Sequence, residues 1–541
     1  MRRQRAVITV FFSLLSVIFL AVSFAVIEAV RTAGARAACA NASTLGLWSV
    51  FSEYDNTLLE DYGLFAVDGG AAGGPVSQEF LLSKLDRYLS ENQNVTADMS
   101  GKLPGLLMDP WKITAVQKRI DRYALLTDQG GNYYYQQAVE YMRKTAWANA
   151  LGKLKAMYSD SQGIRQAESE FEAQQRASHD DMKSFDHEVE AAKQELMQGG
   201  STSGEDSTGG TGQGDGTGGI VILAEGEDAE RLKKAEEEGR KKNPLEKIRS
   251  LQSRSVLELV LGKGKVSSKV LNSSSLLSKR RGNRGALVLD TPRGGQADNL
   301  LFCEYLLDHF PDCSDHKESS VLNYQLEYLI MGRYSDEENL KKIAKKLLFL
   351  REGMNYAFLV TDSSCNAQVS ALAMMVLGWT GKPALIAAFK HAILLAWAYG
   401  ESLFDVRVLL HAGRVPLKKS AQSWNVPLER LISLETDLER ADHIAAGGTT
   451  GLNYKDFLRI LVNMTSLSRL KKRSLDLIEQ NVRTGEGKSS FRIDNCVIGM
   501  TIDTDWEIPS VFGRVPAALL GTKAVSFRTN VKGGFAYGPA D

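Results

Sequence analysis

The stretch AVITVFFSLLSVIFLAVSFAVI, residues 6–27, decides how the rest of the chain is organised. It contains no charged residue, and as a helix it is roughly 33 Å long, enough to cross a bilayer core of about 30 Å. Arg2, Arg3 and Arg5 precede it. The positive-inside rule keeps that basic end in the cytoplasm. We therefore expect a single-pass protein of the cell membrane with a cytoplasmic N-terminus and an extracytoplasmic body.

The apolar stretch has two interpretations, a retained anchor and a cleaved signal peptide. A signal peptide has an apolar core of about 7–15 residues followed by a small-x-small cleavage site. Ala35–Arg36–Ala37 would serve as such a site, but the apolar run is longer than a signal core. The sequence favours the anchor, and the mass of the mature N-terminus would separate the two.

A second pattern follows the apolar run without an intervening proline. Small and then bulky side chains recur at alternating steps of three and four residues, the spacing of a coiled-coil stripe. This helix-packing seam consists of Val30, Ala33, Ala37, Ala40, Thr44, Leu47, Phe51 and Tyr54. We predict one continuous helix from the membrane to about Leu59, with Glu28 and Arg31 paired one turn apart. Small residues let helices approach closely, so the seam is expected to contact other subunits.

The composition limits the classes of protein to which the chain can belong. The chain has 541 residues, with 65 basic and 65 acidic side chains and a formal net charge of zero. It therefore lacks the excess of positive charge that attracts nucleic acid. Its 43% hydrophobic content is typical of folded proteins. At this length two or more domains are expected.

The predicted fold class is α+β and predominantly helical. Expected parts are the membrane helix and its extension (1–60), a small mixed segment (61–132), long charged helices (133–262) and a mixed globular domain (263–541). Within the third part, the segment from Phe171 to Leu251 is highly charged on both sides of a Gly-rich linker at 199–219. We predict a projecting, coiled-coil-like hairpin there, with two independent surface helices as the alternative.

Local patterns in the fourth part predict strands at 321–331, 491–502 and 524–537. They also predict a helix at 337–351 capped by Ser335 and Asp336. The apolar region Ala367–Leu410 contains charged residues, which favours buried core helices over a second or re-entrant membrane segment.

Five cysteines are present, and Cys303 and Cys313 are close enough in sequence to form a disulfide outside the membrane. With His309 and His316 they also suggest a zinc site, but structural zinc usually shows tighter C-x2-4-C pairs. Asp494, Asp503 and Asp505 are calcium candidates, although acids on an exposed strand are the simpler interpretation. We predict no metal and no cofactor.

Known catalytic motifs are missing from the sequence. It contains no serine elbow, no HExxH and no P-loop. We therefore predict no enzyme, no catalytic residues and no small-molecule substrate, and keep a hydrolase with a dispersed site in the Cys365–Leu410 region as an alternative. A basic cluster at Lys279, Arg280, Arg281 and Arg284 is expected on a solvated surface.

Several stretches resemble known families. ITVFFSLLSVIFLAVSFAVIEAVRTAGARAACANAS resembles the membrane helix of tight-adherence (Tad/Flp) pilus-associated proteins, which are pseudopilin-like subunits. YDNTLLEDYGLFAVD, AWAYGESLFDVRVLL and GLNYKDFLRIL resemble an uncharacterised Gram-positive family encoded near such pilus clusters. Processed pilins carry a Gly before the apolar run and a Glu five residues into it. This chain has neither and places Glu28 at the far end.

The resemblance implies a surface-exposed structural or assembly component of a Tad-like pilus or secretion apparatus. Its expected partners are the membrane and, through the N-terminal helix, other pilus or secretion subunits. The alternatives are a stand-alone cell-surface binding module that uses the charged hairpin and, less favoured, an extracytoplasmic hydrolase.

Overall fold

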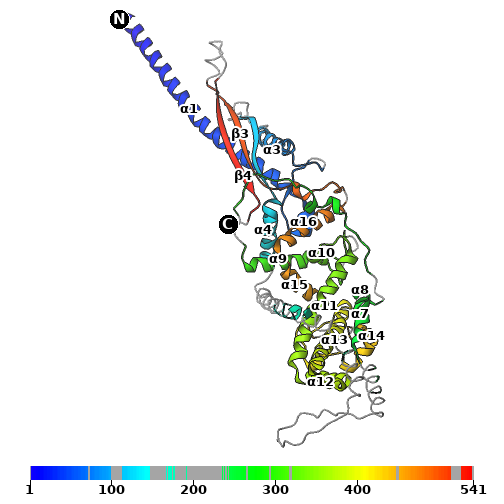
Figure 1. The fold of residues 1–541 in the computed structure, drawn as a ribbon. Coiled ribbons are helices and arrows are strands. Elements are labelled where there is room, and N and C mark those ends of the chain that lie inside the picture. Colours follow the sequence, from blue (N-terminus) through cyan, green and yellow to red (C-terminus); the bar gives the residue numbers. More distant parts are fainter. Residues whose placement is uncertain are drawn as a thin grey trace, which may run out of the picture. The chain divides into compact units, whose positions relative to one another are not determined.

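A computed structural model describes most of the chain. The described residues are 2–70, 73–98, 113–145, 243–262, 266–290, 294–315, 320–445, 450–485, 487–512 and 525–538, with isolated positions between 166 and 241. They form two compact units (Figure 1). The first unit combines Met1–Trp147, Asn272–His309 and Leu467–Asp541, and the second combines Ala148–Leu271 and Phe310–Ser466. Each unit therefore joins stretches that are far apart in sequence, unlike the contiguous segments expected above.

The first unit joins helices to the sheet. Its helices are α1 (Arg2–Ser52), α2 (Asn56–Tyr62), α3 (Gln78–Asp98), α4 (Asp128–Thr145), α9 (Gln296–His309) and α16 (Leu467–Arg483). Short 3-10 turns are η3 (Ser273–Ser275), η4 (Leu277–Lys279) and η8 (Ile493–Asn495). Its strands are β1 (Val67–Asp68), β2 (Thr114–Leu125), β3 (Cys496–Pro509) and β4 (Ser526–Ala536). The two C-terminal strands confirm the strand patterns of the sequence, with shifted ends.

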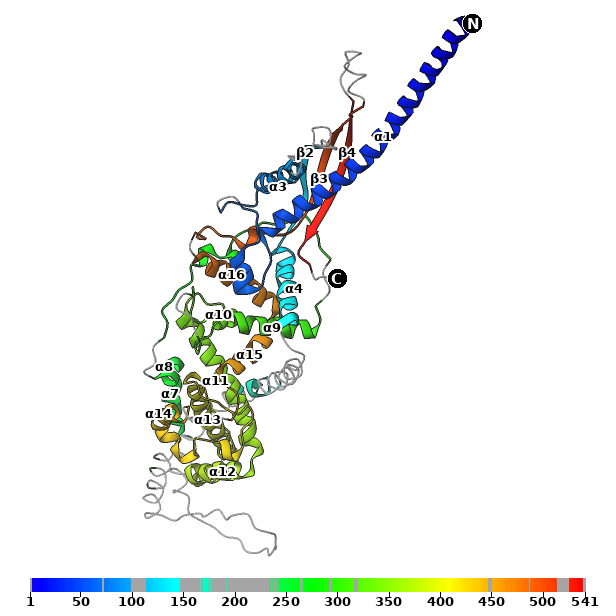
Figure 2. The same cartoon turned by 180° about the vertical axis from the view of Figure 1, so that it is seen from behind.

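Strand β3 is the centre of the antiparallel sheet and pairs with β1, β2 and β4. Successive side chains of a strand point to opposite faces. On β3 one face is buried: Met500, Ile502, Trp506 and Ile508. That face shares a hydrophobic core with α1 and α3. Figures 1 and 2 show both helices running beside the sheet, with the first half of α1 continuing beyond it.

The long N-terminal helix is shorter than predicted. It ends at Ser52, and α2 starts at Asn56, so the expected continuous helix to about Leu59 is wrong. The break coincides with a tertiary contact, because Glu53 turns toward α3, where Lys84 and Tyr88 contact its carboxylate. Asp55 then accepts the N–H of Leu58 at 3.1 Å and caps α2.

The second unit is helical in its described part, which has no named strand. Its α-helices are α7 (Leu245–Gln252), α8 (Val256–Leu261), α10 (Gln325–Met331), α11 (Asp336–Thr361), α12 (Ser363–Leu377), α13 (Pro383–Leu410), α14 (Leu434–Ala445) and α15 (Tyr454–Met464). Its 3-10 helices are η5 (Gly378–Thr380), η6 (Ala421–Ser423) and η7 (Leu428–Ser433). Helix α13 packs against α11, α12 and α14. The cap at Ser335 is confirmed, since its side chain accepts the N–H of Glu338 at 3.1 Å.

The predicted strand at 321–331 is wrong, because this stretch contains α10. Its apolar residues satisfy helical spacing as well as strand character, and short apolar runs do not distinguish the two. Gly332 then ends the helix in the left-handed conformation, with φ 67°.

The second apolar region forms helices, and the predicted burial is confirmed for the later part of α13 but is wrong for most of α12, where Met374 and Met375 are exposed. Helices α12 and α13 cover it, and α13 is buried from Ala396 to Leu409. Among the described residues, one helix is long and apolar enough to cross a membrane, within Ile8–Ser52.

The charged hairpin remains a prediction, because most of Phe171–Leu251 and all of the linker at 199–219 lie outside the described residues. Some described parts of the segment pack against the second unit's core helices. Phe171 packs against Phe349 and Tyr356 of α11. Helix α7 packs against α13.

Candidate functional site

Helix α1 carries two different surfaces in succession. From Ile8 to Ile27 its large apolar side chains are 43–70% exposed. No residue is buried in the most apolar stretch of the helix. An apolar surface of this extent is unfavourable in water and is typical of a membrane anchor or a signal sequence. The N-terminal stretch is therefore a candidate membrane segment.

The end of the apolar segment is fixed to the sheet. The predicted pair Glu28–Arg31 is formed, with 2.8 Å between Oε1 and Nη2. Arg31 also donates a hydrogen bond to the carbonyl of Pro509. The Glu28 carboxylate accepts the backbone N–H groups of Val511 at 3.4 Å and Phe512 at 3.3 Å. This polar junction joins the turn of α1 that follows the apolar segment to the end of β3.

Beyond the junction, one face of α1 is docked on the unit's own sheet. Ala35, Cys39 and Val50 are buried in the shared core. The Trp506 indole N–H donates to the hydroxyl of Ser43 at 3.1 Å, with both groups buried. At the end of the helix, the ring of Phe51 lies 4.5 Å from that of Phe535. The docked face therefore combines apolar packing with a buried hydrogen bond.

The structure divides the predicted seam between two environments. Leu47 and Phe51 are buried, and Tyr54 lies half-buried beyond the end of α1. The other members, which we call the exposed seam, all face solvent: Val30, Ala33, Ala37, Ala40 and Thr44. A straight α-helix drifts by about 20° per heptad relative to a 3.5-residue repeat. Over three heptads the stripe therefore turns from solvent toward the sheet.

The cysteines do not pair in the structure. Cys303 and Cys313 are free thiols, so the possible disulfide is not formed. Cys303 is buried within α9, and the backbone N–H of Cys313 donates to Glu327 at 2.9 Å. His309 stacks on Tyr305, with 4.2 Å between ring centroids, and His316 lies outside the described residues. In the part of the chain that the structure describes, no group of three or more His, Cys, Asp or Glu residues is arranged to hold a metal ion.

The calcium candidates have protein partners. The Asp494 carboxylate is paired with Arg280 and Arg492. The Asn530 amide donates to both Asp503 and Asp505. The three acids therefore belong to two separate hydrogen-bonded groups.

The acids in the Cys365–Leu410 region form a buried ionic network rather than an open cleft. Asp405 lies 2.8 Å from Arg351 and 2.8 Å from Lys419, and Lys419 also contacts Glu401. All four side chains have at most 1% exposure. The two positive and two negative charges balance, and the network joins α11 to α13 and to the segment that follows α13.

The pKa values in this network follow from its contacts. Burial alone would raise the pKa of Asp405, but Lys419 and Arg351 hold it below its usual value. For Glu401, burial dominates over Lys419 and raises the pKa. Such a network stabilises the helix packing and offers no exposed acid or base to a substrate.

Another buried carboxyl, that of Glu327 on α10, was not predicted by any motif in the sequence. It accepts hydrogen bonds from the Tyr454 hydroxyl at 2.8 Å and from the backbone N–H of Cys313. Burial, with a contribution from Asp312, raises its pKa to about 8. Only the folding of α10 against α15 brings these groups together.

Comparison with known proteins gives one match. A family model described as a family of unknown function (DUF5702) matches residues 234–508, just over half of the chain, and the chain belongs to that family. No curated protein and no solved structure matches the chain. The matched region starts after α1, so it carries no information on the N-terminal helix.

Proposed function

We propose that this member of the DUF5702 family is a single-pass, surface-exposed structural or assembly component of a pilus-like or secretion apparatus. Its apolar segment would span the cell membrane with the N-terminus in the cytoplasm. Its exposed seam would contact a neighbouring subunit. The observation that carries the proposal is α1 itself, a 51-residue helix that docks one face on its own unit and leaves the opposite face exposed.

Retention of the anchor is part of the proposal, and the packing of α1 supports it. Cleavage at Ala35–Arg36–Ala37 would cut the helix where Ala35 is buried in the core. It would also remove Glu28 and Arg31, which hold the helix to Pro509 and Phe512. A chain that keeps these contacts keeps the apolar segment as well.

The seam provides the test. Replacing Ala33, Ala37 and Ala40 together with Glu places three charges on the exposed face without entering the core. We expect the variant to fold and insert normally but to lose co-purification with the subunits of the proposed apparatus. Folding is checked by the thiol of Cys39, which is buried on the docked face and should stay unreactive.

A matched control places charges elsewhere on the same unit. Ser83 and Ser90 are exposed on α3, and their replacement with Glu should leave co-purification unchanged. If the seam variant still co-purifies at the level of this control, the exposed seam is not the contact surface and the proposal loses its main support. The intact mass of the mature chain tests anchor retention separately.

A further inference from the structure

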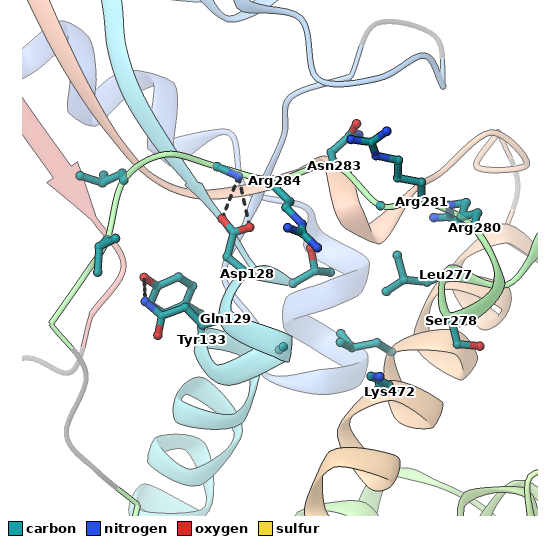
Figure 3. Close-up of a pocket in the computed structure, with 18 residues that line it drawn as sticks. Asp128, Gln129, Tyr133, Leu277, Ser278, Arg280, Arg281, Asn283, Arg284 and Lys472 are labelled. Atoms are coloured by element: carbon teal, nitrogen blue, oxygen red, sulfur yellow. Dashed lines mark hydrogen bonds between the residues drawn. The ribbon is translucent and has the colours of Figure 1, made fainter.

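The first unit contains a cavity that the proposed function does not use. It has a volume of about 640 Å³ and lies between the start of α4, the loop at 277–288 and α16 (Figure 3). The loop contains most of the basic cluster expected on a solvated surface: Arg280, Arg281 and Arg284. Lys472 of α16 completes the positively charged lining.

The loop is held in place by buried acids on other elements. Arg280 bonds to the carboxylates of Glu479 and Asp494, whose side chains are fully buried. Asp494 also accepts the backbone N–H of Asn283 at 3.0 Å. Further along, both oxygens of Asp128 accept the N–H of Gly285 at 3.1 Å (Figure 3). The backbone is therefore fixed on both sides of the remaining arginines.

The cations of the cavity differ in their acid partners: Arg280 is neutralised by its two anchoring acids, and Arg284 lies near Asp128, where its charge acts to lower the pKa of that carboxyl against the effect of burial. Arg281, Arg284 and Lys472 have no salt bridge among the described residues. Arg284 extends from the loop into the space above α4, and Arg281 projects from the rim (Figure 3). Asp128 is the one acid among the described lining residues, and backbone N–H groups occupy its oxygens. Positive charge therefore exceeds negative charge in the cavity.

The third wall brings backbone close to the same space. Gln129, Gly130 and Gly131 have successive φ values of 52°, 68° and 77°, all left-handed. A left-handed Gln is unusual, and strained backbone of this kind gathers at ligand sites. A Cβ atom on Gly130 would meet nothing within 4 Å, so the space beside this turn is open.

We propose that this cavity binds an anion bearing a phosphate group, with Arg284 and Lys472 as its principal contacts and Arg281 at the rim. A guanidinium presents paired N–H donors that match phosphate oxygens, and an ammonium adds a compact charge. The volume accommodates a phosphate together with part of the group that carries it. A free phosphate, a soluble phosphate polymer and a lipid headgroup share this chemistry.

The test measures binding to the full-length chain in neutral detergent. The probes are inorganic phosphate, a water-soluble poly(glycerol phosphate) and, for the lipid source, detergent micelles containing phosphatidylglycerol compared with micelles containing a neutral phospholipid. Arg284→Gln and Lys472→Gln are each expected to weaken binding roughly tenfold, since hydrogen bonds to charged groups are the stronger class. The double variant should abolish saturable binding. Added salt should weaken wild-type binding, because the site is open to solvent.

The control is Arg528→Gln on β4, an exposed arginine outside the cavity. It should bind as the wild type does, and circular dichroism should show that all variants remain folded. Equal binding by the wild type and the double variant would overturn the proposal, as would absence of saturable binding of all three probes. So would an equal loss in the Arg528 control, which would indicate general charge attraction. None of these outcomes depends on subunit co-purification, so the cavity and the seam are tested independently.

Discussion

The docking of α1 on β3 predicts a large and local effect of replacing Trp506 with Ala. Trp506 is fully buried, and its indole N–H bonds to Ser43 on the docked face. A buried indole removes about 150–250 Å² from water, worth about 4–6 kcal/mol at 25 cal/mol per Å². Measured Trp→Ala truncations cost about 3–5 kcal/mol. We therefore expect Trp506→Ala to weaken the docking of the distal half of α1 on the sheet by about 4 kcal/mol.

Cys39 is a reporter of this docking. It is fully buried, and burial raises the pKa of its thiol to about 11, so an alkylating reagent reaches it only when the helix opens. A loss of about 4 kcal/mol corresponds to roughly a thousandfold increase in the open population. Labelling of the full-length chain in detergent, read by mass spectrometry, should accelerate by that order. Hydrogen exchange over residues 35–51 should rise in parallel.

Two variants separate docking from a general effect of losing an indole. Trp48 lies on the same helix but is 56% exposed, so Trp48→Ala should change the free energy of unfolding by less than about 0.5 kcal/mol. Trp506→Phe keeps most of the packing and loses the bond to Ser43, which should cost about 1–3 kcal/mol. If Trp506→Ala leaves Cys39 as protected as Trp48→Ala does, α1 is not held by β3. The division of the seam into buried and exposed parts would then be refuted.

Two further predictions concern the second unit. Because burial raises the pKa of Glu327 to about 8, the folded chain keeps a proton that the unfolded chain releases near pH 4.5. Below that pH, the contribution of Glu327 to the free energy of unfolding is fully present. It falls by at most about 5 kcal/mol as pH rises to 8. Urea unfolding at pH 5 and pH 8 should show this decline, and the decline should be smaller in Glu327→Gln. If the variant loses as much stability between the two pH values as the wild type does, Glu327 is not the group responsible. Asp405→Asn removes the carboxylate shared by Arg351 and Lys419 and should cost about 3–5 kcal/mol. The control is Glu435→Gln at a surface ion pair, which should lower the free energy of unfolding by less than about 1 kcal/mol. If hydrogen exchange over α13 is equal in the two variants, the buried network does not hold that helix.

Local sequence signals determined several elements correctly. The apolar run at 6–27 gave a long helix, the pair Glu28–Arg31 formed, and Ser335 caps α11. Charged residues within Ala367–Leu410 correctly favoured a core helix for the later part of α13, but not for α12. Each of these outcomes depends on residues within a few turns of one another, so periodicity and capping chemistry suffice to predict them.

Other outcomes depend on partners that are distant in sequence. The stretch at 321–331 has apolar residues compatible with a helix or a strand, and α15 packs against the helix that forms. The break after Ser52 depends on α3, which receives the side chain of Glu53. Arg280 lies about two hundred residues from Glu479 and Asp494, so the sequence alone did not show that a basic run would become one wall of a cavity.

Helix α1 shows the same division within one element. The sequence by itself determined that residues 6–27 form an apolar helix and that small side chains continue beyond it. It did not determine which small residues would be buried, because alanines occupy both faces and contribute little hydrophobic area to distinguish them. The sheet decided, since Trp506 bonds to Ser43 and Phe535 packs on Phe51 on one side of the helix, and Ala35 and Cys39 are buried in the same core. Ala33 and Ala37 are left exposed because the bulky partners of α1 all lie on the opposite face.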